Sequence, residues 1–442
     1  MRSSETLDDE HVRGGLQEDA PGAPEPGLIF LFSNGRPAFE VIPLDRGSIE
    51  VGRGEVAGVL IDDKRMSRAH ARISFDGRAW TVKDLGSRNH TVADGQEVSG
   101  LAAKSVHKLV RTGTSLFLLA ADVRPFRAGI ARSGDAVMGP RLQRVFAAIA
   151  RAARSDVHVL HITGESGSGK ELAARAFHDS GPSASGPFVA VNAATLKPEL
   201  AEAMLFGSRK GFYTNAPGGP GFVQTASGGT LFLDEVAELE SSVQAKLLRV
   251  LQSREVTPLG AMTSERVDFR FCSATNADLR SMMAAGKMRQ DLYYRIATPA
   301  VALPPLRDRL EEIPWLIERA VESVEGVGRS LDLHVSFVEA CLLRPWPGNV
   351  RELVAEVKSA AQWAAEEGVV LLASHLQEHA GRVAAPPPPA AAAPSPPTAV
   401  ARPSDEAIEE ALRAAHNNKA AAARALGMHR TQLLRWLEKR GR

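Results

Sequence analysis

The chain has 442 residues, of which 44% are hydrophobic and 24% are charged, and its formal net charge is +1. This composition is typical of soluble globular proteins, and the length is sufficient for about three domains. A net charge so close to zero excludes a global field that attracts nucleic acid, so any such site must be a local patch.

The first 26 residues are polar and acidic and contain Pro and Gly, so we expect residues 1–26 to form a disordered lead rather than a signal peptide. No run approaches the ~20 apolar residues of a membrane span. The two cysteines, Cys272 and Cys341, each lie in an apolar run. We therefore expect buried thiols rather than a disulfide, and a reducing, cytoplasmic location.

Residues 28–122 consist of short apolar stretches separated by turn signals, which predicts an all-β module. Three dipeptides typical of hairpin turns separate the expected strands: Asn34-Gly35, Asp76-Gly77 and Asp94-Gly95. The expected strands include residues 28–32, 39–42, 49–51, 71–75, 80–82 and 116–119.

Three motifs in this module resemble those of forkhead-associated domains, the β-sandwiches that bind phosphothreonine: Gly52-Arg53, the SRAH of residues 67–70 and the DLGSRNHT of residues 84–91. The resemblance implies that Arg53, Ser67 and Arg68 bind the phosphate of a phosphothreonine-bearing protein or peptide, and that Asn89 holds the backbone of that peptide.

Two histidines of the same motifs are expected to affect the shape of the loops. We expect His70 to order the loop beneath the site. His90 replaces the glycine that usually follows the asparagine, and His is among the residues that best tolerate a positive φ. The alternative is a sandwich retained for packing or protein contact without phosphate binding.

Residues 164–171 read GESGSGKE and fit the phosphate-loop pattern G-x-x-x-x-G-K-[ST] except at Glu171. An apolar run at 157–162 predicts a buried strand before the loop, and residues 171–177 favour a helix after it. Backbone amides of the loop and the charge of Lys170 are suited to binding phosphate. The nucleotide-binding residues predicted in the loop are Gly164, Glu165, Ser166, Gly167, Ser168, Gly169, Lys170 and Glu171.

Two later strands are expected to end in polar residues near this loop. The apolar run at 231–233 is followed by Asp234, which would hold Mg²⁺, and Glu235, which would polarise water. A strand at 269–273 leads to Thr275 and Asn276, suited to sensing the γ-phosphate because strand ends face the ligand crevice of an α/β sheet.

Residues 134–380 resemble the AAA+ domain of bacterial enhancer-binding proteins, which activate sigma-54 RNA polymerase. The motifs that carry the resemblance are GESGSGKE, FVAVNAATL (188–196), GGTLFLDEV (228–236), SATN (273–276), RQDLYYRI (289–296), LPPLRDR (303–309) and WPGNVREL (346–353). The resemblance implies an α/β core at 134–305, a helical lid at 306–380, a ring that is expected to be a hexamer, ATP and Mg²⁺ as ligands, and the sigma-54 RNA polymerase holoenzyme as a partner.

The resemblance also assigns roles to four further residues. Asn192 would restrain the catalytic Glu235 until the ring is engaged. Arg289 and Arg295 would reach the nucleotide of the next subunit and stabilise charge on the transferring phosphoryl group. Arg351 would be the sensor residue of the lid. The alternative for Arg289 and Arg295 is a role in surface ion pairs.

The sigma-54-contacting loop of this family reads GAFTGA, and the matching residues 211–216 read GFYTNA. The predicted contacts are Phe212, Tyr213 and Thr214. Phe212 replaces a small residue and Asn215 replaces a glycine, although Asn tolerates the left-handed region better than most residues. These departures favour an alternative in which the ATPase has lost sigma-54 contact.

Residues 381–403 are rich in Ala and Pro, which predicts a semi-rigid unfolded linker. The remainder, 404–442, is predicted to be helical, with an apolar stripe at Ile408, Ala411, Leu412 and Ala415. From 417 to 442 there are seven basic residues (Lys419, Arg424, Arg430, Arg435, Lys439, Arg440, Arg442) and one acidic, Glu438, a local charge of +6.

This tail resembles the Fis-type helix-turn-helix domain that ends most enhancer-binding proteins, and the resemblance implies binding to double-stranded DNA at an upstream enhancer. Its expected DNA contacts are His429, Arg430, Thr431, Gln432 and Arg435. The alternative is a solvated basic helix that binds nothing.

The sequence therefore predicts a multidomain protein with an all-β sandwich, an α/β P-loop core with a helical lid, and a small all-α helix-turn-helix. The first functional hypothesis is an ATP-hydrolysing activator of sigma-54 RNA polymerase, gated by phosphothreonine recognition. The second is a DNA-binding AAA+ regulator that acts by promoter occupancy. The third, a phosphopeptide adaptor with a vestigial motor, is disfavoured by the intact Lys170, Asp234 and Glu235.

Overall fold

The structure is a computed structural model. It describes residues 22–382 except 57–58, 99, 101, 135, 156, 210, 212–217 and 326–330, and residues 405–415, 422, 426 and 437. The chain separates into two compact units, Met1–Val383 and Ala384–Arg442. Among the described residues, no helix has the length and apolar character needed to cross a bilayer.

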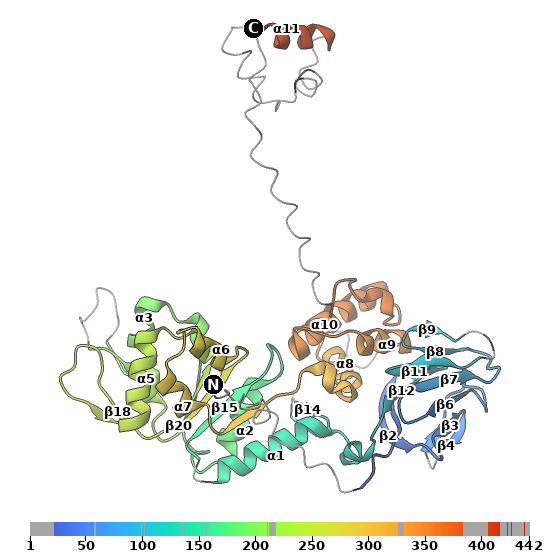
Figure 1. The fold of residues 1–442 in the computed structure, drawn as a ribbon, viewed down its shortest axis with the longest axis horizontal. Helices are drawn as coiled ribbons and strands as arrows, with labels where there is room; N and C mark the ends of the chain where they lie inside the picture. Colours follow the sequence, from blue (N-terminus) through green and yellow to red (C-terminus); the bar gives the residue numbers. More distant parts are fainter. Residues whose placement is uncertain are drawn as a thin grey trace, which may run out of the picture. The chain divides into compact units, whose positions relative to one another are not determined.

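The first part of the larger unit is an antiparallel β-sandwich, as predicted (Figure 1). Its six-stranded sheet has the order β2 (Arg36–Pro43), β1 (Gly27–Ser33), β12 (Ser115–Ala120), β11 (Leu109–Thr112), β8 (Thr91–Ala93) and β9 (Gln96–Glu97). Its four-stranded sheet has the order β10 (Lys104–Val106), β7 (Trp80–Asp84), β6 (Ala71–Phe75) and β3 (Ser48–Val51), and a hairpin pairs β4 (Gly54–Val56) with β5 (Val59–Ile61).

The predicted hairpin turns have two different local structures. Both residues of Asn34-Gly35 and of Asp94-Gly95 have positive φ, as a type I′ turn requires. In Asp76-Gly77 only the glycine does, and the Asp76 carboxylate instead accepts hydrogen bonds from the following backbone amides.

Two predicted boundaries need correction. The backbone oxygens of Glu25 and Pro26 accept hydrogen bonds from Val123 and Leu44, so the folded chain begins before the predicted end of the lead at residue 26. At the other end, the Gly381 amide donates to Glu352 and anchors residues beyond the predicted lid boundary at 380. Residues 1–21 and the linker at 383–403 lie outside the described residues.

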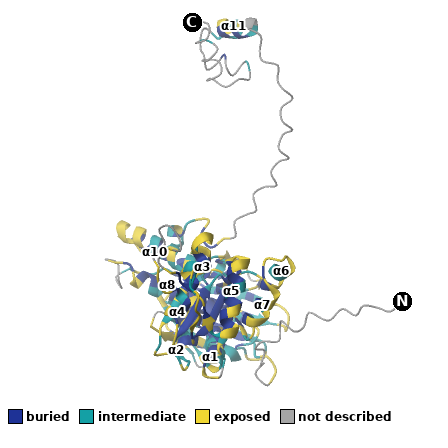
Figure 2. Cartoon of the chain, turned by 90° about the vertical axis from the view of Figure 1, so that its left-hand side faces the viewer, coloured by how far each residue is buried: buried dark blue, intermediate teal, exposed yellow. Residues whose placement is uncertain are grey.

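The α/β core has a parallel sheet in the order β16 (Phe188–Asn192), β17 (Thr230–Asp234), β20 (Arg270–Thr275), β15 (Val159–Thr163) and β21 (Ala300–Ala302). Alternate side chains of β17 enter different cores: Phe232 packs on the side of α1 and α2, whereas Leu231 and Leu233 pack on the side of α5 and α7. Helices therefore cover both faces, and Figure 2 shows the buried residues gathered between them.

The remaining elements of the core are helices α1 (Pro140–Arg154), α2 (Lys170–Asp179), α3 (Pro198–Phe206), α4 (Phe222–Thr225), α5 (Ser241–Ser253), α6 (Leu279–Ala284) and α7 (Gln290–Ile296), and two hairpins, β13 (Ala131–Ser133) with β14 (Ala136–Met138) and β18 (Glu255–Val256) with β19 (Glu265–Arg266).

The helical lid consists mainly of α8 (Ile313–Glu322), α9 (Val335–Leu343) and α10 (Asn349–Glu367). Trp346, in the turn before α10, is fully buried and donates its indole N–H to the Cys341 oxygen at 2.7 Å. Cys272 and Cys341 are buried free thiols, which confirms the prediction.

The smaller unit contains α11 (Asp405–Ala414). Ile408 and Leu412 of the predicted stripe are buried, and Ala411, Ala415, Leu426 and Leu437 pack against them. The apolar stripe is therefore confirmed.

The lid contains a buried carboxyl group with one unsatisfied oxygen, and its effect on stability depends on pH. Glu311 is 2% exposed, one of its carboxyl oxygens has no hydrogen-bond partner, and burial raises its pKa to about 7. Because the pKa is raised in the folded state, the associated stability is present at low pH and is lost as the pH rises from about 4.5 to 7.

We expect Glu311→Gln to remove about 3 kcal/mol of this pH-dependent loss in unfolding free energy. Urea unfolding of the full chain below pH 5 and at pH 8 measures the change. The control Glu366→Gln alters an exposed carboxyl of α10 and is expected to follow the parent. A Glu311→Gln variant that loses as much stability as the parent would contradict the burial argument.

Candidate nucleotide-binding site

The phosphate loop lies between the end of β15 and the start of α2, as predicted. At Gly167 the backbone has φ of 73°, and a methyl group there would lie 2.2 Å from the Gly348 oxygen of the lid. The loop can approach the lid this closely only because residue 167 lacks a side chain. The N-terminus of α2 directs backbone N–H groups toward the loop, which is suited to anion binding.

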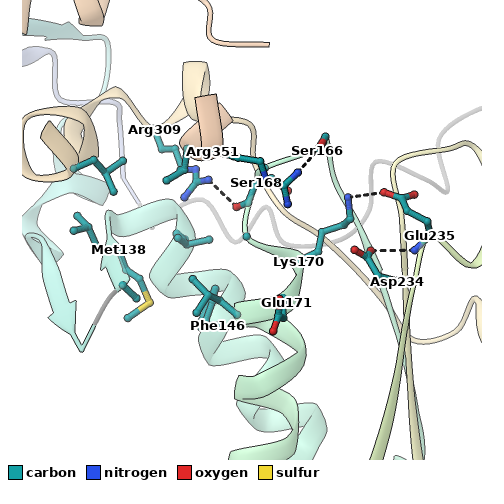
Figure 3. Close-up of a pocket in the computed structure, with 18 of the residues that line it drawn as sticks. Met138, Phe146, Ser166, Ser168, Lys170, Glu171, Asp234, Glu235, Arg309 and Arg351 are labelled. Atoms are coloured by element: carbon teal, nitrogen blue, oxygen red, sulfur yellow. Dashed lines mark hydrogen bonds and ion pairs between the residues drawn. The ribbon is translucent and has the colours of Figure 1, made fainter. Parts of the chain in front are cut away.

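The loop borders a cavity of about 400 Å³ (Figure 3). The hydroxyl oxygen of Ser168 is buried beside this cavity without a hydrogen-bond partner. An orphaned hydroxyl, a helix N-terminus and the buried Lys170 are together suited to a phosphate group. Apolar side chains that could receive a nucleobase also line the cavity: Val137, Met138, Leu142, Phe146, Leu316 and Val350.

Three of the charged residues predicted for catalysis, Lys170, Asp234 and Glu235, meet in this cavity (Figure 3). The Lys170 ammonium lies 3.4 Å from a carboxylate oxygen of Glu235 and donates to the Gly164 oxygen at 3.1 Å. Glu235 itself has φ of 51°, a left-handed conformation uncommon for a non-glycine residue. This backbone geometry follows the last residue of β17, Asp234.

Thr275 and Asn276, the residues expected to sense the γ-phosphate, approach the carboxylate oxygen of Glu235 that Lys170 does not pair with. The Thr275 hydroxyl and the Asn276 amide approach a Glu235 carboxylate oxygen at 3.5 and 3.3 Å. Burial raises the pKa of Asp234; Lys170 opposes this shift and the Glu235 charge adds to it. A cation bound beside these carboxylates would stabilise their charged forms.

The described residues contain no group of three or more His, Cys, Asp or Glu side chains able to enclose a metal by themselves. Asp234 alone with ligand phosphates is nonetheless the way Mg²⁺ is commonly held, because this ion keeps few protein ligands.

Asn192 lies at the end of β16, in register with Asp234, and lines the cavity. Its side-chain oxygen accepts a hydrogen bond from the Ala194 amide at 2.9 Å. The hydrogen bonds to Glu235 described above come from Thr275 and Asn276, so restraint of Glu235 by Asn192 stays a prediction.

The lid contributes several residues to the loop, of which sequence reasoning assigned only Arg351. Its guanidinium donates to the Ser166 hydroxyl at 3.1 Å. Asn349 donates to the Glu165 carboxylate and the Ser166 oxygen, and Arg307 forms a bidentate pair with Glu165. Glu171, the departure from the loop pattern, faces Arg175 along α2.

Arg309 is another residue that the sequence did not single out. It is 2% exposed and donates to the Ser168 oxygen and to the Glu312 carboxylate, both at 2.8 Å. Glu312 in turn accepts from the Gly139 amide at 2.8 Å. The motif LPPLRDR contained the signal, but its arginine could not be placed without the tertiary structure.

Arg289 and Arg295 do not line the cavity of their own chain. Arg289 is exposed at the start of α7 and pairs with Asp291, and Arg295 donates to the Leu251 oxygen. The pairing of Arg289 fits the surface alternative within one chain and leaves a role in a neighbouring subunit as a prediction.

The predicted phosphopeptide residues lie on adjacent loops of the sandwich. Arg53 and Arg68 are exposed, Ser67 accepts a hydrogen bond from the Arg88 amide at 3.2 Å, and Asn89 donates to the Arg65 oxygen at 2.6 Å. Arg53 and Arg68 therefore leave their guanidinium groups accessible to an anion.

The loops beneath these residues are held by buried polar groups. His70 is fully buried between the Ser67 amide and the His90 oxygen, in agreement with its predicted structural role. His90 has φ of 53°, so the position requires the positive φ that the glycine usual in the family adopts easily. Burial favours the neutral form of Asp84, but hydrogen bonds from Ser87 and Thr91 outweigh it and lower its pKa to about 2.

Some predicted contacts lie outside the described residues: the sigma-54 contacts Phe212, Tyr213 and Thr214, and the DNA contacts His429, Arg430, Thr431, Gln432 and Arg435.

Comparison with protein-family models gives four matches along the chain. They are an FHA domain at residues 49–108, a sigma-54 interaction domain at 137–302, an AAA+ ATPase lid domain at 307–392 and a bacterial regulatory protein of the Fis family at 404–439.

Among characterised relatives, the DNA-binding transcriptional regulator NtrC of Rhizobium meliloti (strain 1021) is 47% identical over 216 residues, covering 48% of this chain and 44% of the relative. The Nif-specific regulatory protein of Herbaspirillum seropedicae is 46% identical over 215 residues, covering 48% and 40%. The chain thus spans less than half the length of each of these relatives.

The crystal structure of NtrX from Brucella abortus in complex with ATP is 30% identical, with a TM-score of 0.51, and the match covers 70% of this chain and 69% of NtrX. The ADP complex of the same protein is 27% identical, with the same TM-score and coverage of 72% and 70%.

The phosphate loop, the two carboxylates at the end of β17 and the helical lid define an AAA+ ATPase fold. The chain therefore carries a sigma-54 interaction domain with an AAA+ lid, between an FHA domain in front and a Fis-family domain behind, and over about half of its length it is similar to the transcriptional regulators named above.

The buried pair of Arg309 and Glu312 gives a testable consequence for stability. Arg309→Met is expected to lower the unfolding free energy by about 3–5 kcal/mol, because it leaves the fully buried Glu312 without its cation. Chemical unfolding of the full chain measures the change.

The matched control is Arg307→Met, from the same motif. Its pair with Glu165 is exposed, with side chains 44% and 41% accessible, so we expect a cost below about 1 kcal/mol. Equal effects of the two substitutions would contradict the assignment of Arg309 as the buried tie between lid and phosphate loop.

Proposed function

We propose that this protein is an ATP-hydrolysing, DNA-binding transcriptional regulator that activates sigma-54 RNA polymerase and is gated by phosphothreonine recognition. The observation that carries the proposal is the meeting of Lys170, Asp234 and Glu235 in one cavity at the phosphate loop. A binding module without turnover would not need the water-polarising carboxylate.

The proposed substrate is ATP. Lys170 and the loop amides hold its phosphates, and the apolar side chains that line the cavity take the base. Asp234, together with the phosphates, would hold Mg²⁺, which would supply charge neutralisation at the transferring group. Glu235 orients and polarises the attacking water, and Thr275 and Asn276 fix the position of its carboxylate.

The proposed active form is a ring, a hexamer by analogy with the family. Arg289 and Arg295 lie away from the cavity of their own chain, so they are available to a nucleotide in an adjoining subunit. A cation supplied in trans stabilises charge that develops in the transition state, which makes hydrolysis depend on assembly.

The front module is proposed to receive the regulatory signal, and the tail is proposed to bind the target DNA site. Arg53, Ser67, Arg68 and Asn89 bind a phosphothreonine-bearing protein or peptide, as their shared loop surface supports. The basic tail, including Arg430 and Arg435, binds double-stranded DNA at an upstream enhancer. The proposed location is the cytoplasm.

A second candidate function rests on the residues 211–216. Phe212 and Asn215 depart from the family loop GAFTGA, and this favours a DNA-binding AAA+ regulator that hydrolyses ATP but acts by promoter occupancy without sigma-54 contact.

In-vitro transcription from a sigma-54 promoter tests the main proposal and separates it from the second. The full chain with ATP is expected to produce transcript, and Glu235→Gln is expected to lose at least about 100-fold in turnover, together with transcription, while still binding ATP. Lys170→Ala is expected to lose both binding and activity. ATP turnover without transcript would favour promoter occupancy, and parental turnover by Glu235→Gln would refute the assigned role.

Phosphothreonine recognition is tested by titrating the full chain with a degenerate phosphothreonine peptide mixture. We expect binding that requires the phosphate, and a loss of about 10-fold or more in Ser67→Ala because a donor to a charged acceptor is removed. Arg78→Ala, on the exposed 76–79 turn, is the control. Equal binding of the unphosphorylated mixture would contradict the proposal.

A further inference from the structure

The adjacent strands β1 and β12 of the six-stranded sheet are buried on both faces, although an antiparallel sheet commonly leaves one face to solvent. Along β1, Leu28 and Phe30 enter the core of the sandwich, whereas Ile29 and Leu31 enter a different core. Both Ile29 and Leu31 are fully buried. The outward face of this sheet must therefore be covered by another part of the chain.

The helical lid provides that cover. One continuous apolar cluster joins outward residues of β1, β11 and β12 to residues of α8 and α9. Figure 1 shows α9 beside β11 and β12, and contacts join α8 to β2 and α9 to β12. The cluster includes Leu109, Leu116 and Leu118 from the sandwich and Ile317, Phe337 and Val338 from the lid.

An ion pair fixes the register of this interface. Arg111 of β11 donates to Glu339 of α9 at 2.7 Å, and the Glu339 side chain is 9% exposed. Its other carboxylate oxygen is buried without a partner. Burial raises the pKa of Glu339 and the Arg111 charge opposes the shift. The carboxylate therefore depends on the sandwich for its compensating charge.

The rim of the interface adjoins the phosphopeptide loops. The lid residue His334 caps α9 by accepting the Ser336 amide, and burial together with the charges of Arg65 and Arg111 lowers its pKa. Arg65 is also the residue whose backbone oxygen receives the Asn89 side chain. A ligand that engages Asn89 therefore acts on Arg65, and the charge of Arg65 in turn influences His334, the residue that caps α9.

The segment that contains Arg65 is anchored to a neighbouring strand by hydrogen bonds of Asp63. Asp63 is fully buried and accepts hydrogen bonds from the Thr114 amide at 2.6 Å and the Ser115 hydroxyl at 3.0 Å. These bonds tie the loop ahead of Ser67 to the start of β12, the strand against which α9 packs. A shift at the phosphopeptide loops can thus be transmitted to the interface rather than absorbed.

The lid continues from this interface to the nucleotide site. α8 packs along α10, and the first turn of α10 binds the phosphate loop through Asn349 and Arg351. The lid helices therefore contact the sandwich through α8 and α9 and the nucleotide loop through the first turn of α10.

We propose that the sandwich docks in cis on the lid as a restraint on lid movement during the nucleotide cycle, and that phosphopeptide binding at Asn89 and Ser67 loosens this docking. The second clause rests on the phosphothreonine recognition proposed above, whereas the docking does not. Because the peptide acts on turnover only through this interface, breaking the interface also removes the effect of the peptide on turnover.

Charge reversal at the ion pair tests the restraint in the full chain. Arg111→Glu and Glu339→Arg are each expected to increase hydrogen exchange in α9 and to raise ATP turnover by about fivefold or more, the low end of usual coupling between sites. The double variant is expected to restore both toward the parent values.

The matched control is Arg72→Glu, which reverses an arginine of the exposed pair with Glu50 on the other sheet of the sandwich, and we expect no change. If Arg111→Glu fails to fold, Glu339→Gln removes the charge with little change of shape and carries the same expectations. Unchanged exchange in α9 overturns the docking, and increased exchange with unchanged or lower turnover overturns the restraint.

The phosphothreonine peptide mixture then separates this inference from the proposed function. A mixture that binds is expected to raise turnover in the parent and to have no further effect in Arg111→Glu. Binding without a change in turnover overturns the link between the two sites. A mixture that does not bind the parent refutes the recognition proposal, and with it the loosening clause, while the charge-reversal result still decides the docking.

Discussion

Four consecutive residues of the phosphate loop are hydrogen bonded to the lid, and the rest of the motor depends on this contact. The loop residues are Glu165, Ser166, Gly167 and Ser168, and their partners are Arg307, Asn349, Val350, Arg351 and Arg309. A loop bound to the sheet alone would keep its shape whatever the lid did. Here the lid holds the loop through its hydrogen bonds, so a lid that moved would have to move the loop or break these bonds, and the nucleotide bound by the loop would favour one outcome over the other.

The parts of this arrangement that are local in sequence could be predicted. The phosphate loop follows a strand and precedes a helix, and Asp234 and Glu235 end an apolar run, so their chemistry is visible within a few residues. The turn glycines and the alternation of the sandwich strands are equally local. Such features depend on backbone angles and side-chain period, which neighbouring residues determine.

The parts that could not be predicted join distant residues. Arg309 contacts a loop residue 141 positions away, and Arg111 contacts Glu339 across 228 positions. Arg309 lies in the motif LPPLRDR, but neither that motif nor the residues around Arg111 identify the distant partner of each arginine. The sequence around Ile29 and Leu31 predicts an apolar strand, but it does not predict which part of the chain covers the outward face of that strand. Both residues are nevertheless fully buried. The left-handed backbone of Glu235 is likewise set by the packed site.

The two-sided burial of the front sheet also limits how such regulators can be assembled from parts. A sensory module that hangs on a flexible tether can be exchanged for another without regard to the surface of its neighbour. This sandwich instead contributes residues to an apolar core that it shares with the lid, and it supplies Arg111, one partner of the ion pair with Glu339. A transplanted substitute would leave α8 and α9 uncovered, so module and motor in this chain are expected to have diverged as a matched set.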